Sequence, residues 1–124
     1  MCSSDLVKSI VKDGTEYIWQ GDPKFWARSA PIMFPICGGL KNDTYTLDGV
    51  AYQLPKHGFA PKREFEVESV TADTATLVLR DSEETRASYP FAFALRVTFK
   101  LVGETLETTY VIENNDEKIG RAHV

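Results

Sequence analysis

Alternating apolar and polar residues are most regular toward the C-terminal end of the chain and predict a β-hairpin there. Between residues 95 and 101 an apolar side chain occupies every second position, which is the period of a strand with one apolar face. Gly103-Glu104 then provides a two-residue turn with glycine first. Folding about this turn sets Leu101 opposite Leu106 and keeps polar residues opposite polar ones, so both faces predict the same register.

A second hairpin is predicted around Asp48-Gly49. Both central residues of a type I′ turn need positive φ, and Asp-Gly is one of the pairs that adopt it most readily. The turn sets Tyr45 opposite Tyr52 and Leu47 opposite Val50. The chain is therefore expected to contain at least two antiparallel strand pairs.

The remaining pattern predicts shorter strands and almost no helix. The helical signal is confined to residues 22–26, where Asp22 can cap a single turn and Pro23 can occupy its first position. Four further strands are predicted, at residues 7–11, 17–19, 63–70 and 75–80. The fold class that follows is all-β, an antiparallel β-sandwich or part of one.

Composition fits one globular domain and argues against several classes of protein. The 124 residues contain 14 Lys and Arg against 18 Asp and Glu, a net charge of −4, whereas a nucleic-acid-binding protein normally has a basic excess. No apolar run approaches the roughly 20 residues of a membrane span, and the N-terminus lacks a signal-peptide pattern. We therefore expect a cytoplasmic protein with no membrane and no nucleic-acid partner. The two cysteines suggest neither a disulfide framework nor a metal site.

The two ends of the chain differ from its middle, and one piece of DNA can explain both. Read from a GTG start codon, residues 1–5 can be encoded by GTG TGC TCT TCC GAT, and the opposite strand then encodes the sequence of residues 119–123. That DNA resembles a short-read sequencing adapter. We therefore expect residues 1–6 and 119–124 to be non-native and residues 7–118 to be biological. Two ordinary chain ends are the alternative.

His57 is the strongest candidate for acid–base chemistry. A histidine can donate or accept a proton near neutral pH. It lies between Pro55, which stiffens the chain, and Gly58, which allows close approach of a ligand or of backbone. A lone histidine in a loop is nevertheless more often structural or exposed than catalytic, so the residue types alone leave its role open.

Other residues favour structural interpretations. Cys37 has no neighbouring base or metal partner in the sequence and is interpreted as a small buried apolar residue. Trp19, Trp26 and Phe34 could stack against a sugar ring, but aromatic residues at strand spacing are more typical of a core. The glutamates at positions 64, 66 and 68 are interpreted as a solvated strand face rather than an acidic site.

Several ordered motifs resemble the N-terminal region of one enzyme family. They are residues 16–23, 25–26, 30–38, 40–45, the Asp48-Gly49 hairpin, residues 54–60, and residues 89–91 with the hairpin that follows to residue 114. In order and spacing they are similar to the aldose 1-epimerase (galactose mutarotase) family, closest to its bacterial LacX-type subgroup. The resemblance covers nearly all of residues 7–118. It implies part of the galactose mutarotase-like supersandwich, a β-fold of roughly 290 residues or more, so the chain would be its first third.

The resemblance also implies a reaction that needs no metal and no cofactor. Family members interconvert the α and β anomers of a free aldose: a base takes the proton of the anomeric hydroxyl, an acid protonates the ring oxygen, and the opened ring closes on its other face. His57 matches the first of two active-site histidines, which helps to hold the sugar and the developing charge. The second histidine and the glutamate base have no counterpart here, and His123 is not assigned to either role. The chain is therefore expected to be catalytically incomplete.

One departure from the family pattern affects the expected sugar contacts. Gly39 stands where many relatives have an arginine that contacts the substrate. A glycine cannot donate the hydrogen bonds of a guanidinium. Three outcomes stay open: another basic residue such as Lys41 or Arg63 takes over this contact, the substrate differs, or the epimerase activity is weak. Trp19 completes the predicted substrate-binding set.

Two alternatives to a free-aldose epimerase stay open. The missing arginine fits a non-catalytic carbohydrate-binding or sugar-sensing domain on the same fold. Basic residues near His57, namely Lys56, Lys62 and Arg63, fit a hexose-6-phosphate epimerase. In each case the expected partner is a small sugar, and the sequence does not predict an oligomeric state.

Overall fold

The computed structural model describes residues 6–117 and divides them into two compact units. Residues 6–44 and 54–64 form one unit, which contains His57 and is called the histidine unit below. Residues 45–53 and 65–117 form the other, which contains the long strands and is called the sheet unit. The ends that were expected to be non-native lie outside the described residues, apart from Leu6.

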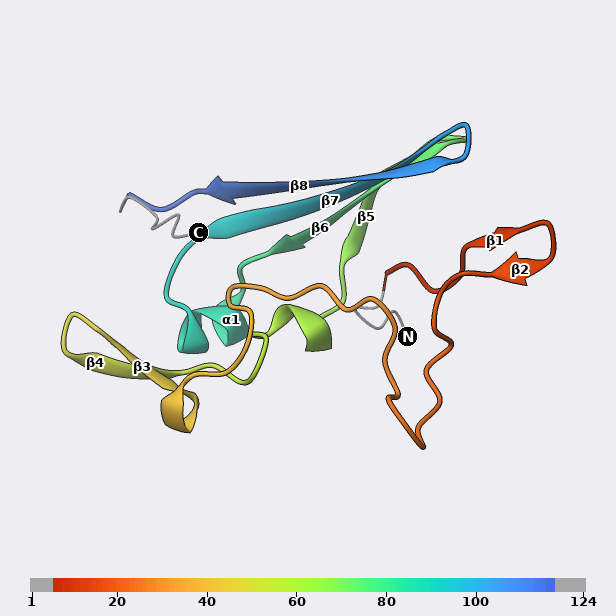
Figure 1. Ribbon diagram of the computed structural model, residues 1–124. Coiled ribbons are helices and arrows are strands. Elements are labelled where there is room, and N and C mark those ends of the chain that lie inside the picture. Colours follow the sequence, from red (N-terminus) through yellow and green to blue (C-terminus); the bar gives the residue numbers. More distant parts are fainter. Residues whose placement is uncertain (1–5, 118–124) are drawn as a thin grey trace. The chain divides into compact units, whose positions relative to one another are not determined.

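A four-stranded antiparallel sheet dominates the sheet unit, in the strand order β5-β6-β7-β8 (Figure 1). Its strands are β5 (Glu66–Val70), β6 (Thr74–Arg80), β7 (Phe93–Val102) and β8 (Thr105–Asn114). The hairpin of β7 and β8 has the predicted register, with Leu101 paired with Leu106. A shift by one residue would turn the apolar side chains of β7 to the wrong face, and this is why the pattern specifies the register.

The two faces of this sheet differ in chemistry. On one face, β7 buries Leu95 and Val97. On the other, the guanidinium of Arg96 donates to the carboxylates of Glu68, at 2.8 Å, and Glu113. The prediction of a polar strand face is thus confirmed for Glu68, whose charge is paired with arginine rather than gathered into an acidic site.

Strand β5 begins later than predicted. The chain first makes a 3-10 turn at Ala60–Lys62, which Arg63 closes by donating its backbone N–H to the carbonyl of Ala60 at 3.2 Å. Residues 63–65 therefore lie outside the strand, and Phe65 is buried at its entrance. The prediction that the strand starts at residue 63 is wrong because Arg63 closes this turn and pairing with β6 begins only at Glu66, opposite Val78.

The hairpin of β3 (Thr44–Leu47) and β4 (Val50–Gln53) confirms the Asp48-Gly49 turn, whose residues have φ of 49° and 80°. The rings of Tyr45 and Tyr52 stack with centroids 5.5 Å apart. The hydroxyl of Tyr45 donates to the carbonyl of Ser88 at 2.7 Å. Burial, together with the neighbouring Tyr52 and Tyr89, raises the pKa of Tyr45 to about 12.

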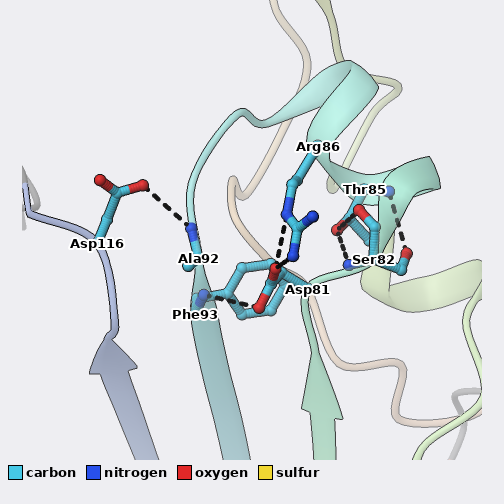
Figure 2. Close-up of polar contacts among 7 residues, drawn as sticks. All are labelled: Asp81, Ser82, Thr85, Arg86, Ala92, Phe93 and Asp116. Atoms are coloured by element: carbon cyan, nitrogen blue, oxygen red, sulfur yellow. Dashed lines mark hydrogen bonds and ion pairs between the residues drawn. The ribbon is translucent and has the colours of Figure 1, made fainter.

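Sequence reasoning missed one helix, α1 (Glu83–Ser88), which lies between β6 and β7. Ser82 caps it: its hydroxyl accepts from the N–H of Thr85 at 3.2 Å, and the hydroxyl of Thr85 accepts from the N–H of Ser82 at 2.8 Å (Figure 2). This is a reciprocal capping box with threonine in place of the usual glutamate or glutamine. A six-residue helix carries too little periodicity to be predicted from the apolar pattern.

Carboxylates hold the start of β7 in place. Asp81 accepts from the guanidinium of Arg86 and from the N–H of Phe93, the latter at 3.3 Å (Figure 2). Asp116 accepts from the N–H of Ala92 at 3.3 Å. Charged acceptors therefore satisfy two backbone donors where the ladder of the sheet begins.

The histidine unit contains one short hairpin, formed by β1 (Val11–Lys12) and β2 (Thr15–Glu16). Of the predicted strand at 7–11 only Val11 lies in a strand, and the predicted strand at 17–19 is wrong because these residues form none. The carboxylate of Glu16 accepts from the N–H groups of Ile10 and Ile18, at 2.9 and 2.8 Å. A longer ladder would have used the N–H of Ile10, so the carboxylate ends the pairing.

The predicted single turn after Asp22 is confirmed. The N–H of Trp26 donates to the carbonyl of Asp22 at 2.9 Å, and the N–H of Lys24 donates to its side chain at 2.9 Å. Within residues 6–117, no helix has the length and apolar character needed to cross a membrane.

Candidate functional site

His57 lies in a tight turn that is fixed by a loop about twenty residues earlier in the chain. Its backbone N–H donates to the carbonyl of Gly38 at 2.8 Å, and its carbonyl accepts from the N–H of Phe34 at 3.2 Å. The carbonyl of Phe34 in turn accepts from the N–H groups of Phe59 and Ala60, at 3.0 and 3.1 Å. The backbone on both sides of the histidine is thus held by the same loop.

Two consecutive residues with positive φ make this turn possible. His57 has a φ of 68° and Gly58 a φ of 74°. A Cβ atom on Gly58 would lie 2.1 Å from the carbonyl oxygen of Phe34, so only glycine fits there. A residue other than glycine at positive φ is uncommon, and such residues concentrate at functional sites. Five other non-glycine residues among residues 6–117 also have a positive φ, so this backbone conformation alone assigns His57 no role.

Residues that flank this turn form a small apolar core. The rings of Phe34 and Phe59 meet edge to face with centroids 5.9 Å apart, and both side chains are buried. The other buried apolar residues of this unit are Ile32, Leu54, Ala60 and Pro61. Because the residues on either side of His57 anchor this core, the histidine is carried on a part of the unit that has little freedom to move.

The imidazole of His57 accepts a hydrogen bond at one nitrogen. The backbone N–H of Gly38 donates to Nδ1 at 3.0 Å. An imidazolium has no acceptor nitrogen, so this contact requires a neutral ring with its proton on Nε2. The half-buried side chain can therefore present an N–H donor to an oxygen atom of a ligand.

Lys56 lies beside the open position at Gly39. A Cβ built on Gly39 would have the Cγ of Lys56 as its nearest neighbour, at 4.0 Å, which is an ordinary van der Waals distance. Neither Lys41 nor Arg63 contributes an atom within 4 Å of that point. The structure therefore brings Lys56 and His57 together with the pair of glycines at 38 and 39.

The other predicted substrate contacts lie in the same unit. Lys41 is exposed on the 3-10 turn Lys41–Asp43, and Arg63 is half-buried at the end of the turn Ala60–Lys62. Trp19 is 46% exposed, and its Nε1–H donates to the carbonyl of Trp26 at 2.6 Å. The indole nitrogen of Trp19 is thus engaged within the unit, which leaves its ring surface as the part that could meet a ligand.

Two structural interpretations need correction. Cys37 is exposed rather than buried, with its Sγ 3.7 Å from the Sδ of Met33, because its segment is a turn and has no inner strand face. The core interpretation is right for Phe34 but wrong for Trp19 and Trp26, which are 46% and 54% exposed. The segments of both tryptophans form turns and loops rather than strands.

Sequence reasoning did not find the imidazole partner, Gly38. The bond joins residues 19 positions apart through irregular backbone, and no periodic pattern signals such a pairing. Lys56 had a signal, namely its place next to His57, but not its position beside Gly39. In the described part of the chain, no three His, Cys, Asp or Glu side chains gather closely enough to hold a metal ion.

Comparisons with known proteins converge on one family. The family model described as aldose 1-epimerase matches residues 5–119. The chain is 38% identical over 108 residues to the chromosomal protein LacX of Lactococcus lactis subsp. lactis, covering 83% of this chain and 36% of that protein. The plasmid LacX of the same organism matches with the same identity and coverage.

Solved structures agree with this result. A galactose mutarotase related enzyme from Lactobacillus acidophilus is 45% identical with a TM-score of 0.83, and 85% of this chain matches 35% of that chain. A galactose mutarotase-like protein from Lactobacillus casei is 34% identical with a TM-score of 0.89, and 95% of this chain matches 41% of that chain. The predicted fold class, antiparallel β of the galactose mutarotase-like type, is thereby confirmed. The chain spans about a third of the length of the curated relatives that it matches.

Proposed function

Because the chain belongs to the aldose 1-epimerase family, we propose that it forms one side of a sugar site at which the α and β anomers of a free aldose are interconverted. Residues 7–118 would be the N-terminal third of such a protein. The second histidine and the base of the reaction would come from the remainder. This chemistry needs two groups that exchange protons with the sugar, and no cofactor.

The observation that carries this proposal is the hydrogen bond from Gly38 to Nδ1 of His57. It leaves Nε2 as a fixed N–H donor on a turn with little freedom to move. A donor of this kind can hold a sugar oxygen and stabilise the negative charge that develops there as the ring opens. His57 would therefore hold and polarise the sugar rather than remove a proton from it.

The other predicted contacts have supporting roles. The exposed ring of Trp19 offers a face on which the C–H groups of a sugar can stack. Lys41 and Arg63 carry hydrogen-bond donors that suit hydroxyl oxygens. These assignments rest on exposure and residue chemistry within the histidine unit.

The decisive measurement is anomer exchange in the protein that carries this segment together with the rest of the fold. Starting from pure α-glucose or α-galactose, NMR exchange or polarimetry gives the rate. His57→Ala should lower the rate by roughly 100-fold, the scale of losing one hydrogen-bond donor that stabilises developing negative charge. His57→Gln, whose amide can replace the Nε2–H donor, should retain more activity than alanine. A full-rate alanine variant would remove His57 from the site.

The second candidate is a non-catalytic carbohydrate-binding or sugar-sensing domain. Gly39 favours it, because this position beside His57 contributes no side chain to the chemistry. In this case the protein that carries the segment would bind the sugar without any acceleration of anomer exchange. The 124-residue chain alone should show no exchange activity under either proposal.

A further inference from the structure

Residues 19–28 of the histidine unit form a loop that closes on itself, called the aromatic loop below. The indole N–H of Trp19 donates to the carbonyl of Trp26 at 2.6 Å. Close to the two ends of the loop, a Cβ placed on Gly21 would lie 2.7 Å from the carbonyl oxygen of Ala27, so the backbone approaches itself there. The aromatic loop therefore behaves as one body that carries the exposed ring of Trp19.

Arg28 joins the aromatic loop to the turn that follows His57. Its guanidinium Nη1–H donates to the carbonyl of Pro61 at 3.1 Å, across 33 positions of the sequence. Pro61 is buried in the turn Ala60–Lys62. The N–H of the first residue of this turn donates to the carbonyl of Phe34, whose own N–H donates to the carbonyl of His57. One guanidinium thus connects the aromatic loop with the backbone that carries the histidine.

The surroundings of Arg28 fit an anchor for the loop. Residues 22–27 are all exposed, whereas Arg28 is half-buried. No carboxylate lies within ion-pair distance of its guanidinium among residues 6–117. Because a hydrogen bond from a charged donor is stronger than one between neutral groups, the contact with Pro61 can hold a loop that buries little surface of its own.

We propose that Arg28 is a positioning residue of the sugar site, which fixes the ring of Trp19 relative to the Nε2–H of His57. This inference rests on the proposed function, in which the ring offers a stacking face and the histidine offers a donor. Both must meet one sugar molecule, so a loop that is ordered before the sugar arrives lowers the entropy cost of binding. Arg28 acts through the aromatic loop and does not touch the sugar itself.

Steady-state kinetics of the protein that carries this segment together with the rest of the fold test the inference. Trp19→Ala should raise the KM for α-glucose about fivefold and change kcat by less than about twofold, because a ring contact binds the sugar equally before and during ring opening. Arg28→Met keeps an apolar stem, removes the donors and should raise KM by a similar factor. Arg28→Lys keeps a charged donor and should recover part of the loss.

The double variant separates positioning from a purely structural role. Trp19→Ala combined with Arg28→Met should have the KM of Trp19→Ala alone, because the ring that Arg28 positions is gone. A purely structural arginine would change the folded fraction and hence the apparent kcat, and would leave KM unchanged. Lys24→Met makes the same change of charge within the aromatic loop and should not alter KM.

The outcomes also distinguish this inference from the proposed function. An unchanged KM in Trp19→Ala or in Arg28→Met, or two effects that multiply in the double variant, would overturn the positioning role and leave the sugar site standing. If Arg28→Met does not fold, the same cycle with Arg28→Lys decides. A full-rate His57→Ala variant would remove the sugar site and this inference with it.

Discussion

The sheet unit and the histidine unit are built on different physical principles. The sheet unit repeats one interaction, the pairing of neighbouring antiparallel strands. The β6–β7 and β7–β8 pairs each keep one register over their whole paired length, and only the β5–β6 pair shifts, between Val67 and Ser69. The histidine unit relies on individual contacts, because a few backbone hydrogen bonds and a buried glycine fix a single side chain. We therefore expect the histidine unit to lose most stability when a single backbone position is disturbed. The sheet unit should lose most stability when a buried side chain is truncated.

The largest effect is expected for Gly58→Ala. The new Cβ would collide with the carbonyl oxygen of Phe34, and the residue would keep a positive φ. Backbone strain and the loss of two hydrogen bonds to that carbonyl should lower the free energy of unfolding of the histidine unit by about 4 kcal/mol. Hydrogen exchange of the Phe59 and Ala60 amides, together with urea unfolding, measures the loss.

The control for this substitution lies in the sheet unit. Gly49 has a similar φ of 80° but no atom within 4 Å of a Cβ placed there. Gly49→Ala should therefore lower the free energy of unfolding by only about 1 kcal/mol, the strain of an alanine backbone at positive φ. Equal losses from the two alanine substitutions would mean that the close approach to Phe34 contributes nothing.

A slightly smaller effect is expected for Leu95→Ala in the sheet. The side chain is 2% exposed, and its removal leaves a cavity that should cost about 3 kcal/mol. Ile112, its partner on β8, is 61% exposed, so Ile112→Ala should cost no more than about 0.5 kcal/mol. Denaturant midpoints of the two variants give the comparison, and a large loss at Ile112 would show that this face is covered in solution.

Helix α1 provides a smaller and more local test. Ser82→Ala removes the hydroxyl that accepts from Thr85, and loss of an N-cap typically costs about 1 kcal/mol. Ser82→Asp restores an acceptor and should recover most of this stability. Hydrogen exchange of the Thr85 amide reports both variants; unchanged exchange in the alanine variant would show that the cap does not hold the helix.

The smallest effect concerns the ionic face of the sheet. The hydrogen bond from Arg96 holds the pKa of Glu113 below its usual 4.5. The stability that this pair adds is therefore present above pH 4.5 and is lost as the pH falls through the lowered pKa. In Arg96→Gln the pKa of Glu113 should return toward 4.5, which NMR titration of its carboxyl group would show. The free energy of unfolding of the sheet should also fall less as the pH is lowered.

Asp73 is the internal control for that titration. Hydrogen bonds from the hydroxyls of Thr74 and Thr71 lower its pKa, and Arg96 is not a cause of this shift. It should therefore keep its low pKa in the Arg96→Gln variant. A parallel rise at both carboxyls would point to a general change in the sheet instead of the loss of one ion pair.

The strands were more predictable from sequence than the site, for a physical reason. Side-chain alternation specifies both the existence and the register of a strand pair, so the pairing of Leu101 with Leu106 follows from local pattern. Capping by Ser82 was missed because threonine replaces the usual residue of the capping box. The strand ends were wrong where a side chain, such as the carboxylate of Glu16, bound a backbone N–H that a longer ladder would have used.

The site could be predicted only as far as a family resemblance identifies residues. His57 was proposed from its residue type and its motif, and its role in the site stays a prediction. Its link to Gly38 and the place of Lys56 beside Gly39 depend on how two irregular loops meet, and neither loop has a repeating pattern. The exposure of Cys37 was misjudged for the same reason, since the direction of a side chain in a turn does not follow from alternation.

Strand β8 has a consequence for how this chain behaves at high concentration. It is an edge strand ten residues long, and Tyr110, Val111 and Ile112 are exposed along it. Its outer edge meets no other strand of the described sheet, so it offers a row of backbone groups to any extended segment that arrives. Self-association should therefore begin at this strand, and a lysine or proline on its outer edge should delay the process without touching the site around His57.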